Sequence, residues 1–105
     1  MKRIPYTTSW REDLSSVDAL DNNIDVFVEF SDGSRYTATF FTLHNLNTLM
    51  REYELTGECA GGLYIWASDM IVVRELSPAS IEQCVASLIE NHEFEGAFTR
   101  LEDLD

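Results

Sequence analysis

Hydrophobic and polar residues alternate along two neighbouring stretches of the chain, residues 24–30 and 35–41. A period of two is typical of a strand with one face in the core. In the first stretch, the residues that share the apolar face are Ile24, Val26, Val28 and Phe30. The turn-forming residues 31–34 (SDGS) lie between the stretches, so the pattern predicts a β-hairpin.

The register of this hairpin depends on the length of its loop. A two-residue loop would place apolar residues of the first strand opposite threonines of the second. A three-residue loop with Gly33 in the left-handed conformation instead places Val28 opposite Tyr36 and Glu29 opposite Arg35. We predict the second register because it pairs apolar with apolar and acid with base.

Two later segments carry apolar residues at helical spacing, and we predict one helix over about 44–55 and a second that begins near Pro78. The apolar positions of the first are Leu46, Leu49, Met50 and Tyr53. Those of the second are Ile81, Cys84, Val85, Leu88 and Ile89. Gly57 is placed to end the first helix, while Ser77 and Pro78 are placed to begin the second.

Three further segments have weaker patterns. Ser9 and Glu12 have the spacing of a capping box, which predicts a short helix over about 10–19. Residues 57–62 (GECAGG) read as a chain reversal. Residues 63–66 and 70–74 are β-branched or aromatic and are separated by a turn, so we predict a second hairpin.

The order β-β-α-β-β-α predicts an α+β fold with a four-stranded, largely antiparallel sheet. We expect both main helices on one face and a short N-terminal helix. The single domain would divide into an N-terminal extension (1–23), an α+β core (24–98) and an acidic tail (99–105). Phe94 and Phe98 would pack back onto the core.

The second sheet face would carry Phe27, Phe41 and one side of the second hairpin. This is more apolar surface than a small monomer usually exposes. We expect either the N-terminal helix, through Trp10 and Leu14, or another chain to cover it.

Composition and charge narrow the possible functions. The chain has 105 residues and a net charge of −12, and half of that charge lies in residues 77–105. A protein with this much negative charge repels the phosphates of nucleic acids and anionic lipids. We therefore expect neither nucleic acid nor membrane partners. No apolar run approaches a membrane span, and residues 1–6 precede no signal-like apolar stretch, so we expect a cytoplasmic protein.

Catalytic and metal-binding patterns are sparse, and we expect a non-enzymatic protein without cofactors or metals. The two cysteines and two histidines match no zinc spacing, and nothing in the sequence implies a disulfide. Residues 57–62 lack the lysine of a phosphate-binding loop. They also lead from a predicted helix into a predicted strand, whereas a phosphate-binding loop leads from a strand into a helix. The alternative to a non-enzymatic protein is a pocket near His44, Cys59 and Asp69 that serves as an enzyme active site or binds a small ligand.

Tyr64 and Trp66 lie beside a turn at Asp69. Because large aromatic side chains are usually buried, we expect Trp66 in the core. The alternative is that both aromatics anchor a protein contact, since such residues are common at interface hot spots.

Several stretches resemble a family of small, uncharacterised bacterial cytoplasmic proteins with no assigned activity. They are residues 25–41 (DVFVEFSDGSRYTATFF), 46–50, 56–62 (TGECAGG), 64–71 (YIWASDMI) and the helix that ends in Phe94 and Phe98. The resemblance spans residues 24–98 and implies a bacterial, cytoplasmic α+β protein. It implies no functional residues.

Three functional hypotheses follow. The first is a non-catalytic, acidic protein-binding module, such as an immunity or inhibitor protein that neutralises a basic toxin. Its partner-binding residues would be Tyr64, Trp66, Asp69, Glu82, Glu90, Glu93 and Glu95. The second is a homo-oligomeric structural or regulatory domain that binds a second copy of itself, and the third is the pocket described above.

Overall fold

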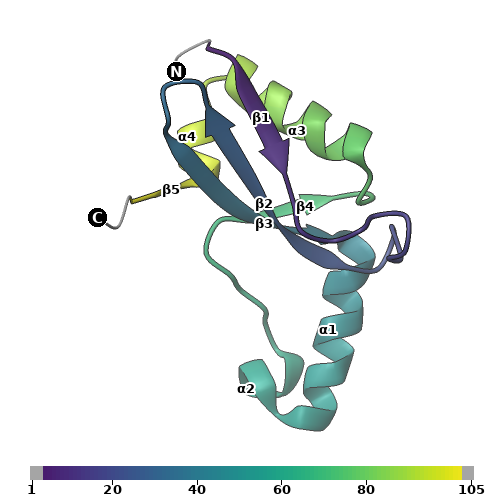
Figure 1. Cartoon of the computed structure of the whole chain (residues 1–105). Helices are drawn as coiled ribbons and strands as arrows, with labels where there is room; N and C mark the ends of the chain where they lie inside the picture. Colours follow the sequence, from purple (N-terminus) through teal and green to yellow (C-terminus); the bar gives the residue numbers. More distant parts are fainter. Residues whose placement is uncertain (1–3, 103–105) are drawn as a thin grey trace.

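Two long antiparallel strands form the centre of a five-stranded sheet (Figure 1). The computed structural model describes residues 4–102. Its elements are β1 (Tyr6–Ser9), β2 (Asn23–Phe30), β3 (Arg35–Thr42), α1 (Leu43–Thr56), α2 (Glu58–Gly62), β4 (Met70–Val73), α3 (Pro78–Glu90), α4 (Phe94–Ala97) and β5 (Thr99–Leu101). The predicted α+β class with a mostly antiparallel sheet is confirmed.

The hairpin of β2 and β3 has the register that the sequence predicts. Glu29 lies opposite Arg35, and Val28 lies opposite Tyr36. Gly33 has a φ of 90°, and the Phe30 N–H donates to the Ser34 carbonyl at 2.9 Å. The loop therefore has three residues, and the left-handed conformation that it requires falls on a glycine.

The outer strands differ from the prediction. β1 pairs antiparallel with β2, while β4 pairs in parallel with the second half of β3. β5 pairs antiparallel with the first half of β3, so residues 99–101 form a strand where the sequence predicted a tail. Residues 63–66 form no strand, so the predicted second hairpin is wrong. The 27 residues between β3 and β4 form a crossover, which a parallel pair requires.

The predicted N-terminal helix over 10–19 is also wrong, because side chains there bind the backbone locally. Asp13 accepts from the Ser15 N–H at 3.0 Å, and Asp18 accepts from the Leu20 N–H at 2.9 Å. Such bonds compete with the helical hydrogen bonds of the same backbone. Ser9 meanwhile pairs with Phe27 in the sheet and does not cap a helix.

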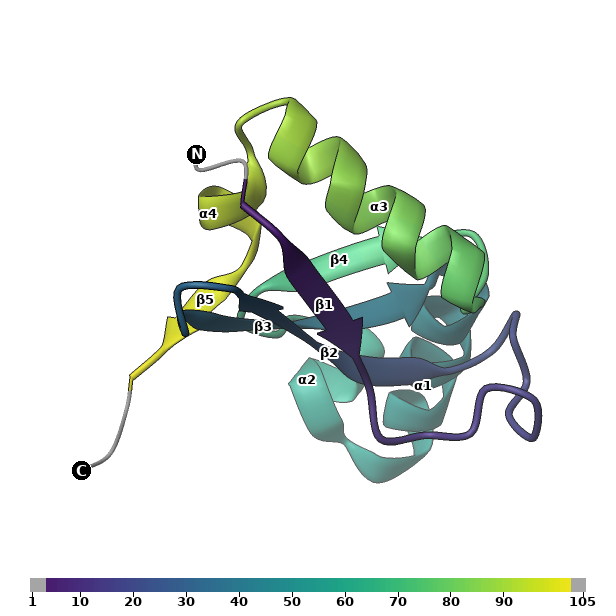
Figure 2. The same cartoon turned by 45° about the horizontal axis from the view of Figure 1, so that its top comes forward.

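The two other predicted helices are confirmed, as are the predicted end of the first and the predicted start of the second. α1 ends at Gly57, which is left-handed with a φ of 86°. The Ser77 side chain caps α3 by accepting from the Ser80 N–H at 3.1 Å. The helices do not share one face of the sheet as predicted, since α3 and α4 lie on one side and α1 and α2 on the other (Figure 2).

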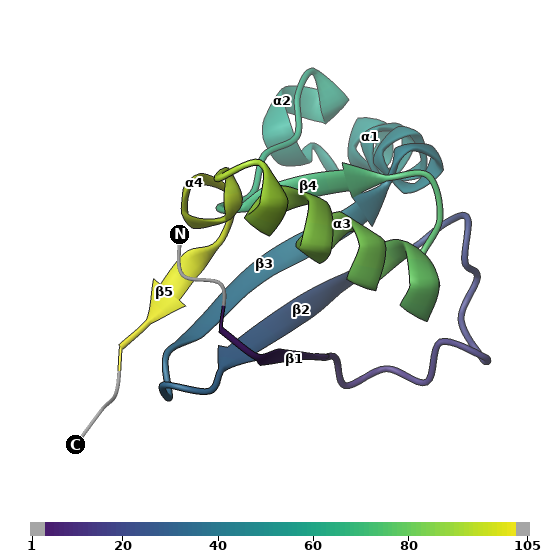
Figure 3. The same cartoon turned by 90° about the horizontal axis from the view of Figure 1, so that it is seen from above.

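The core lies between α3, α4 and the inner face of β2 and β3 (Figure 3). Phe94 and Phe98 are buried there as predicted, and their rings stack at 4.5 Å. Phe30 and Tyr36 contact the Phe94 ring edge-on. Burial raises the pKa of the Cys84 thiol, which packs against this core as an uncharged group.

Candidate functional site

Residues 43–69 form a lobe that extends from the sheet on the side opposite α3 (Figures 1 and 2). The lobe contains α1, α2 and the segment that returns to β4. Its only buried residue is Asn45. The apolar stripe predicted for α1 is only half-buried. The lobe therefore has no buried apolar core of its own.

Several large apolar side chains of this lobe are exposed. Within residues 4–102, eight large hydrophobic side chains are exposed, and five of them belong to the lobe. The five are Leu43, Leu55, Leu63, Tyr64 and Trp66. Trp66 is 70% exposed and Tyr64 is 49% exposed, so the expectation that Trp66 lies in the core is wrong.

A network of polar side chains joins the lobe to the sheet. The Asn45 side chain donates to Asp21 at 2.9 Å and accepts from the Asn23 side chain at 2.9 Å. The Thr48 hydroxyl donates to the other Asp21 oxygen at 3.0 Å. The Asn45 hydrogen bond lowers the pKa of Asp21 most, with smaller contributions from Thr48 and the nearby His44, while partial burial opposes them.

The Thr42 hydroxyl extends this network to the start of α1. It accepts from the Asn45 N–H at 3.1 Å and donates to the Leu20 carbonyl at 2.8 Å. No sequence motif or spacing singles out Asp21, Asn23 or Thr42. The available signal was the threonine directly before α1, a favourable helix N-cap residue.

Close backbone contact fixes α2 against α1. Gly62 has a φ of 85°, and a Cβ added there would lie 2.2 Å from the Met50 carbonyl oxygen. Cys59 and Ala60 also have positive φ, so the chain turns left-handed within the predicted reversal. Burial raises the pKa of Tyr53 on the facing side of α1, and the negative charge of Glu58 adds to this effect.

His44, Cys59 and Asp69 do not form one pocket. His44 lies in the first turn of α1 and Cys59 lies beyond its end, which separates them by about 20 Å along the 14-residue helix. The His44 Nε2 lies 3.6 Å from Asp21 Oδ2, and the Asp69 carboxylate accepts a hydrogen bond from Thr99. His44 and Asp69 therefore have different partners.

The acidic residues predicted to bind a partner lie away from the aromatic ones. Glu82 and Glu90 belong to α3, and Glu93 and Glu95 lie at the start of α4, on the other side of the sheet from the lobe (Figure 2). Glu82 accepts a hydrogen bond from Thr8 of β1 at 3.4 Å. The predicted set therefore divides into two surfaces, with Asp69 at the base of the lobe.

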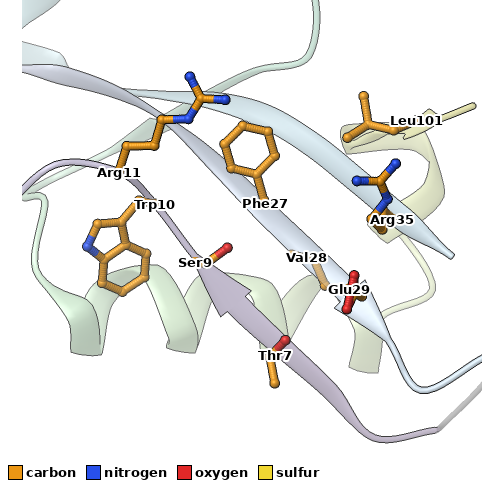
Figure 4. Close-up of a pocket in the computed structure, with 9 residues that line it drawn as sticks. All are labelled: Thr7, Ser9, Trp10, Arg11, Phe27, Val28, Glu29, Arg35 and Leu101. Atoms are coloured by element: carbon orange, nitrogen blue, oxygen red, sulfur yellow. The ribbon is translucent and has the colours of Figure 1, made fainter. Parts of the chain in front are cut away.

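A hollow of about 480 Å³ lies on the open face of the sheet, beside Phe27 (Figure 4). The Arg11 guanidinium lies 5.7 Å from the centre of the Phe27 ring, so a cation covers part of this aromatic side chain. Arg35 lies opposite Glu29 at the other end. The residues that line the hollow include no histidine or cysteine.

Within residues 4–102, no group of histidine, cysteine or acidic side chains is arranged to hold a metal ion. No helix in the same part of the chain is long and apolar enough to cross a membrane. Cys59 and Cys84 are free thiols. The surfaces with the most distinctive chemistry are therefore the apolar lobe and the acidic face of α3.

Comparisons with known proteins add no family assignment. The chain matches no family model, no curated protein and no solved structure.

Proposed function

We propose that the protein is a non-catalytic, acidic protein-binding module that uses its lobe to bind a partner protein with a basic surface. The specific form that we propose is an immunity or inhibitor protein that neutralises a basic partner such as a bacterial toxin.

One observation carries the proposal: the lobe exposes five large hydrophobic side chains and buries only Asn45. Removing apolar surface from water stabilises a protein by about 25 cal/mol per Å², and the five exposed side chains forgo much of this gain in the isolated chain. More exposed apolar surface than a small monomer usually has is typical of a protein interaction site. Trp66 and Tyr64 are the residue types that most often dominate the binding energy of an interface.

Charge favours a basic protein as the occupant of this surface. The lobe carries four acidic residues and one basic residue, and the whole chain has a net charge of −12. A positively charged partner would be attracted over long range and would then contact apolar side chains surrounded by acids. A second copy of the chain would be repelled by the same charge, so self-association is the less favoured alternative.

The partner is best identified by crosslinking from the lobe itself. A photo-crosslinking amino acid at Tyr64 is expected to capture a basic protein. The same group at Leu20, which is exposed outside the lobe, is the matched control and is not expected to capture it. Capture of copies of this chain alone, or of an acidic protein, would contradict the proposal.

Calorimetry with the purified, captured protein then tests the anchor residues. The double variant Trp66→Ser and Tyr64→Ser is expected to weaken binding by about a hundredfold or more, since each interface hot spot contributes about 2 kcal/mol. Leu20→Ser is the control and should bind like the original chain. Unchanged affinity in the double variant would exclude the lobe as the interface.

Long-range attraction has a separate kinetic test. Charge reversal at Glu82, Glu90, Glu93 and Glu95 should slow association with the same partner and flatten the salt dependence of the rate. Association rates that stay the same at low salt would show that the acidic surface does not steer this partner.

A further inference from the structure

We propose that the outer edge of β4 binds an extended, basic segment of another protein, which adds to the sheet as an antiparallel strand. The proposed function concerns exposed side chains of the lobe, whereas this inference concerns backbone groups of the sheet. It therefore goes beyond that function and does not depend on it.

β4 lies at one edge of the sheet (Figure 3). It pairs with Thr39–Thr42 in the second half of β3, while β5 pairs with the first half of the same strand. No strand within residues 4–102 pairs with the other side of β4. The outer edge of β4 is therefore open in this part of the chain.

The two ends of the described range lie away from this edge. Ile4, the first described residue, lines a small hollow with Phe30. Leu101, close to the last described residue, pairs with Arg35. Phe30 and Arg35 flank the hairpin loop, whereas β4 lies beside the opposite end of β3.

Two residues of β4 direct their backbone groups away from the sheet. The Asp69 carbonyl accepts from the Thr39 N–H at 3.0 Å, so Asp69 is directed towards β3. Because this direction alternates along a strand, Met70 directs its N–H and C=O groups outward, and so does Val72. An added strand can form hydrogen bonds with these four groups.

The sequence of β4 does not protect this edge. Residues 70–73 (MIVV) include no charged side chain and no proline, two of the features that prevent an open strand from pairing. Val72 is 48% exposed. Three of the four residues are β-branched, and such residues favour strands. The edge therefore suits pairing with a further strand.

The hydrophobic core is incomplete along the same edge. In the central strands, the inward side chains of Val26 and Phe40 are fully buried. Ile71 lies beside Phe40 in the ladder, yet Ile71 and Val73 are only half-buried at the margin of the core. An added strand would cover them with its own inward side chains. The ligand should therefore carry apolar residues at alternate positions.

The position of α3 accounts for this incomplete cover. Glu82 and Ala86 line a hollow beside β1, at the other edge of the sheet. Cys84 is two positions from each of them, or about 200° around the helix, so it lies on the side of α3 towards β4. Cys84 is itself only half-buried. The helix therefore leaves room for further apolar contact along this side.

Charge distinguishes a basic segment from the other possible occupants. The whole chain has a net charge of −12, while residues 70–73 are uncharged. A second copy of this chain would be repelled by that charge. A segment with lysine or arginine beside its apolar residues would be attracted, so we expect a basic segment of another protein.

A labelled peptide of sequence KVTVTVK tests the inference by fluorescence anisotropy. The salt concentration is 0.15 M, at which charges more than about 8 Å apart are largely screened. We expect saturable binding, accompanied by changes in the amide NMR signals of Met70 and Val72. Failure of this peptide to bind would overturn the proposal.

The peptide EVTVTVE is the charge control. It keeps the alternation but carries acids at both ends, so it should bind about tenfold more weakly because each attraction becomes a repulsion. Equal binding of the two peptides would contradict the choice of a basic occupant.

Backbone methylation of the basic peptide distinguishes strand addition from simple charge attraction. Side chains opposite one another in an antiparallel pair share a face, so the valines cover Ile71 while the threonines lie opposite Met70 and Val72. The threonines therefore direct their N–H groups to β4. Methylation of both threonine nitrogens should abolish binding, whereas methylation of the nitrogens of the fourth and sixth residues should leave it intact. Equal binding of the methylated peptides, or loss with the methylated valines alone, would exclude an antiparallel added strand.

Val72→Pro tests the same hydrogen bonds from the protein side. Proline removes an N–H that faces outward and takes no part in pairing with β3, so an edge strand tolerates it. Peptide binding should weaken about tenfold or more, since one hydrogen bond is lost. The methylated peptides test the unchanged protein and keep the proposal falsifiable if this variant does not fold.

Thr8→Pro is the matched control at the opposite edge. The Pro5 carbonyl accepts from the Ser31 N–H, so Thr8 also directs its N–H away from the sheet. Thr8→Pro should bind the peptide like the original chain, and circular dichroism checks that both variants are folded. Equal losses of binding in the two variants would contradict a site at β4.

Two further outcomes would also overturn the proposal. The first is self-association through β4, seen as NMR shifts of Met70 and Val72 that depend on protein concentration, because the occupant would then be a second copy. The second is loss of peptide binding in the Trp66→Ser and Tyr64→Ser variant, which would place the peptide on the lobe. That variant should bind the peptide normally, so failure of the edge and failure of the lobe can be told apart.

Discussion

Asn45 donates a side-chain hydrogen bond to Asp21, which lies 24 positions earlier in the chain, with the two atoms 2.9 Å apart. Asn45 is the one buried residue of the lobe, and its side chain joins the lobe to the sheet through polar contacts. Polar contacts need defined geometry, whereas apolar contacts tolerate sliding. The network therefore fixes the start of α1 against the sheet.

Asn45→Ala should lower the free energy of unfolding. The substitution leaves partly buried polar groups of Asp21 and Asn23 without this hydrogen-bond partner, which costs about 1–3 kcal/mol. Urea titration followed by circular dichroism measures the change. Asn47→Ala is the matched control, because Asn47 is exposed on the same helix, and alanine there should leave stability unchanged or slightly higher. Equal effects at both positions would contradict the role given to Asn45.

The lowered pKa of Asp21 predicts an acid-dependent loss of stability. The folded state binds this proton less tightly than the unfolded state, chiefly because Asn45 donates to the carboxylate. The stabilisation is therefore complete above the ordinary aspartate pKa of about 3.9 and is lost as the pH falls through the lower folded-state value. Urea midpoints measured between about pH 5 and pH 2 should decrease with acid.

Asp21→Asn isolates this contribution from those of the other carboxylates. The amide keeps the size of the side chain but has no charge to titrate, so the decrease in the urea midpoint should be shallower than in the original chain. Glu12→Gln removes an exposed carboxylate elsewhere and is the control. The prediction is contradicted if the urea midpoint of Asp21→Asn decreases with acid as steeply as that of the original chain.

Gly62→Ala should disrupt the contact between α2 and α1. Its Cβ would lie 2.2 Å from the Met50 carbonyl oxygen, which cannot move without distorting α1. Gly61→Ala is the matched control, because Gly61 also has a positive φ but an added Cβ would meet nothing within 4 Å. We expect Gly61→Ala to cost about 1–2 kcal/mol from the left-handed backbone alone, and Gly62→Ala to cost more. Thermal unfolding of the two variants measures the difference, and equal losses would contradict the close contact.

Local patterns in the sequence predicted the elements that are stabilised locally. The alternation around Gly33 predicted the hairpin and its register, and the stripe that includes Ile81 and Val85 predicted α3. The pairing of β4 could not be found in this way, because its partner in β3 lies across a 27-residue crossover. Residues 63–66 have the composition of a strand, yet no strand within residues 4–102 is placed to pair with them.

The candidate site was only partly predictable for a related reason. Tyr64 and Trp66 were recognised as one candidate contact, but the tendency of large aromatics to be buried favoured the wrong environment for Trp66. Asp21 and Asn45 follow no spacing rule that would link them. β1 has the Tyr-Thr-Thr sequence of a strand, but four residues are too few for a clear alternation.

Trp66→Ala and Phe94→Ala should differ strongly in their effect on stability. Trp66 is 70% exposed, so its removal should change the free energy of unfolding by no more than about 0.5 kcal/mol. Phe94 is fully buried among three other aromatic rings, so its removal should cost about 3–5 kcal/mol. Urea titration compares the two variants.

A second measurement uses Trp10→Phe, in which the remaining fluorescence comes from Trp66 and should be quenched by acrylamide nearly as well as free tryptophan. A large loss of stability in Trp66→Ala, or fluorescence protected from acrylamide, would place Trp66 in the core and remove the anchor on which the proposed binding function rests.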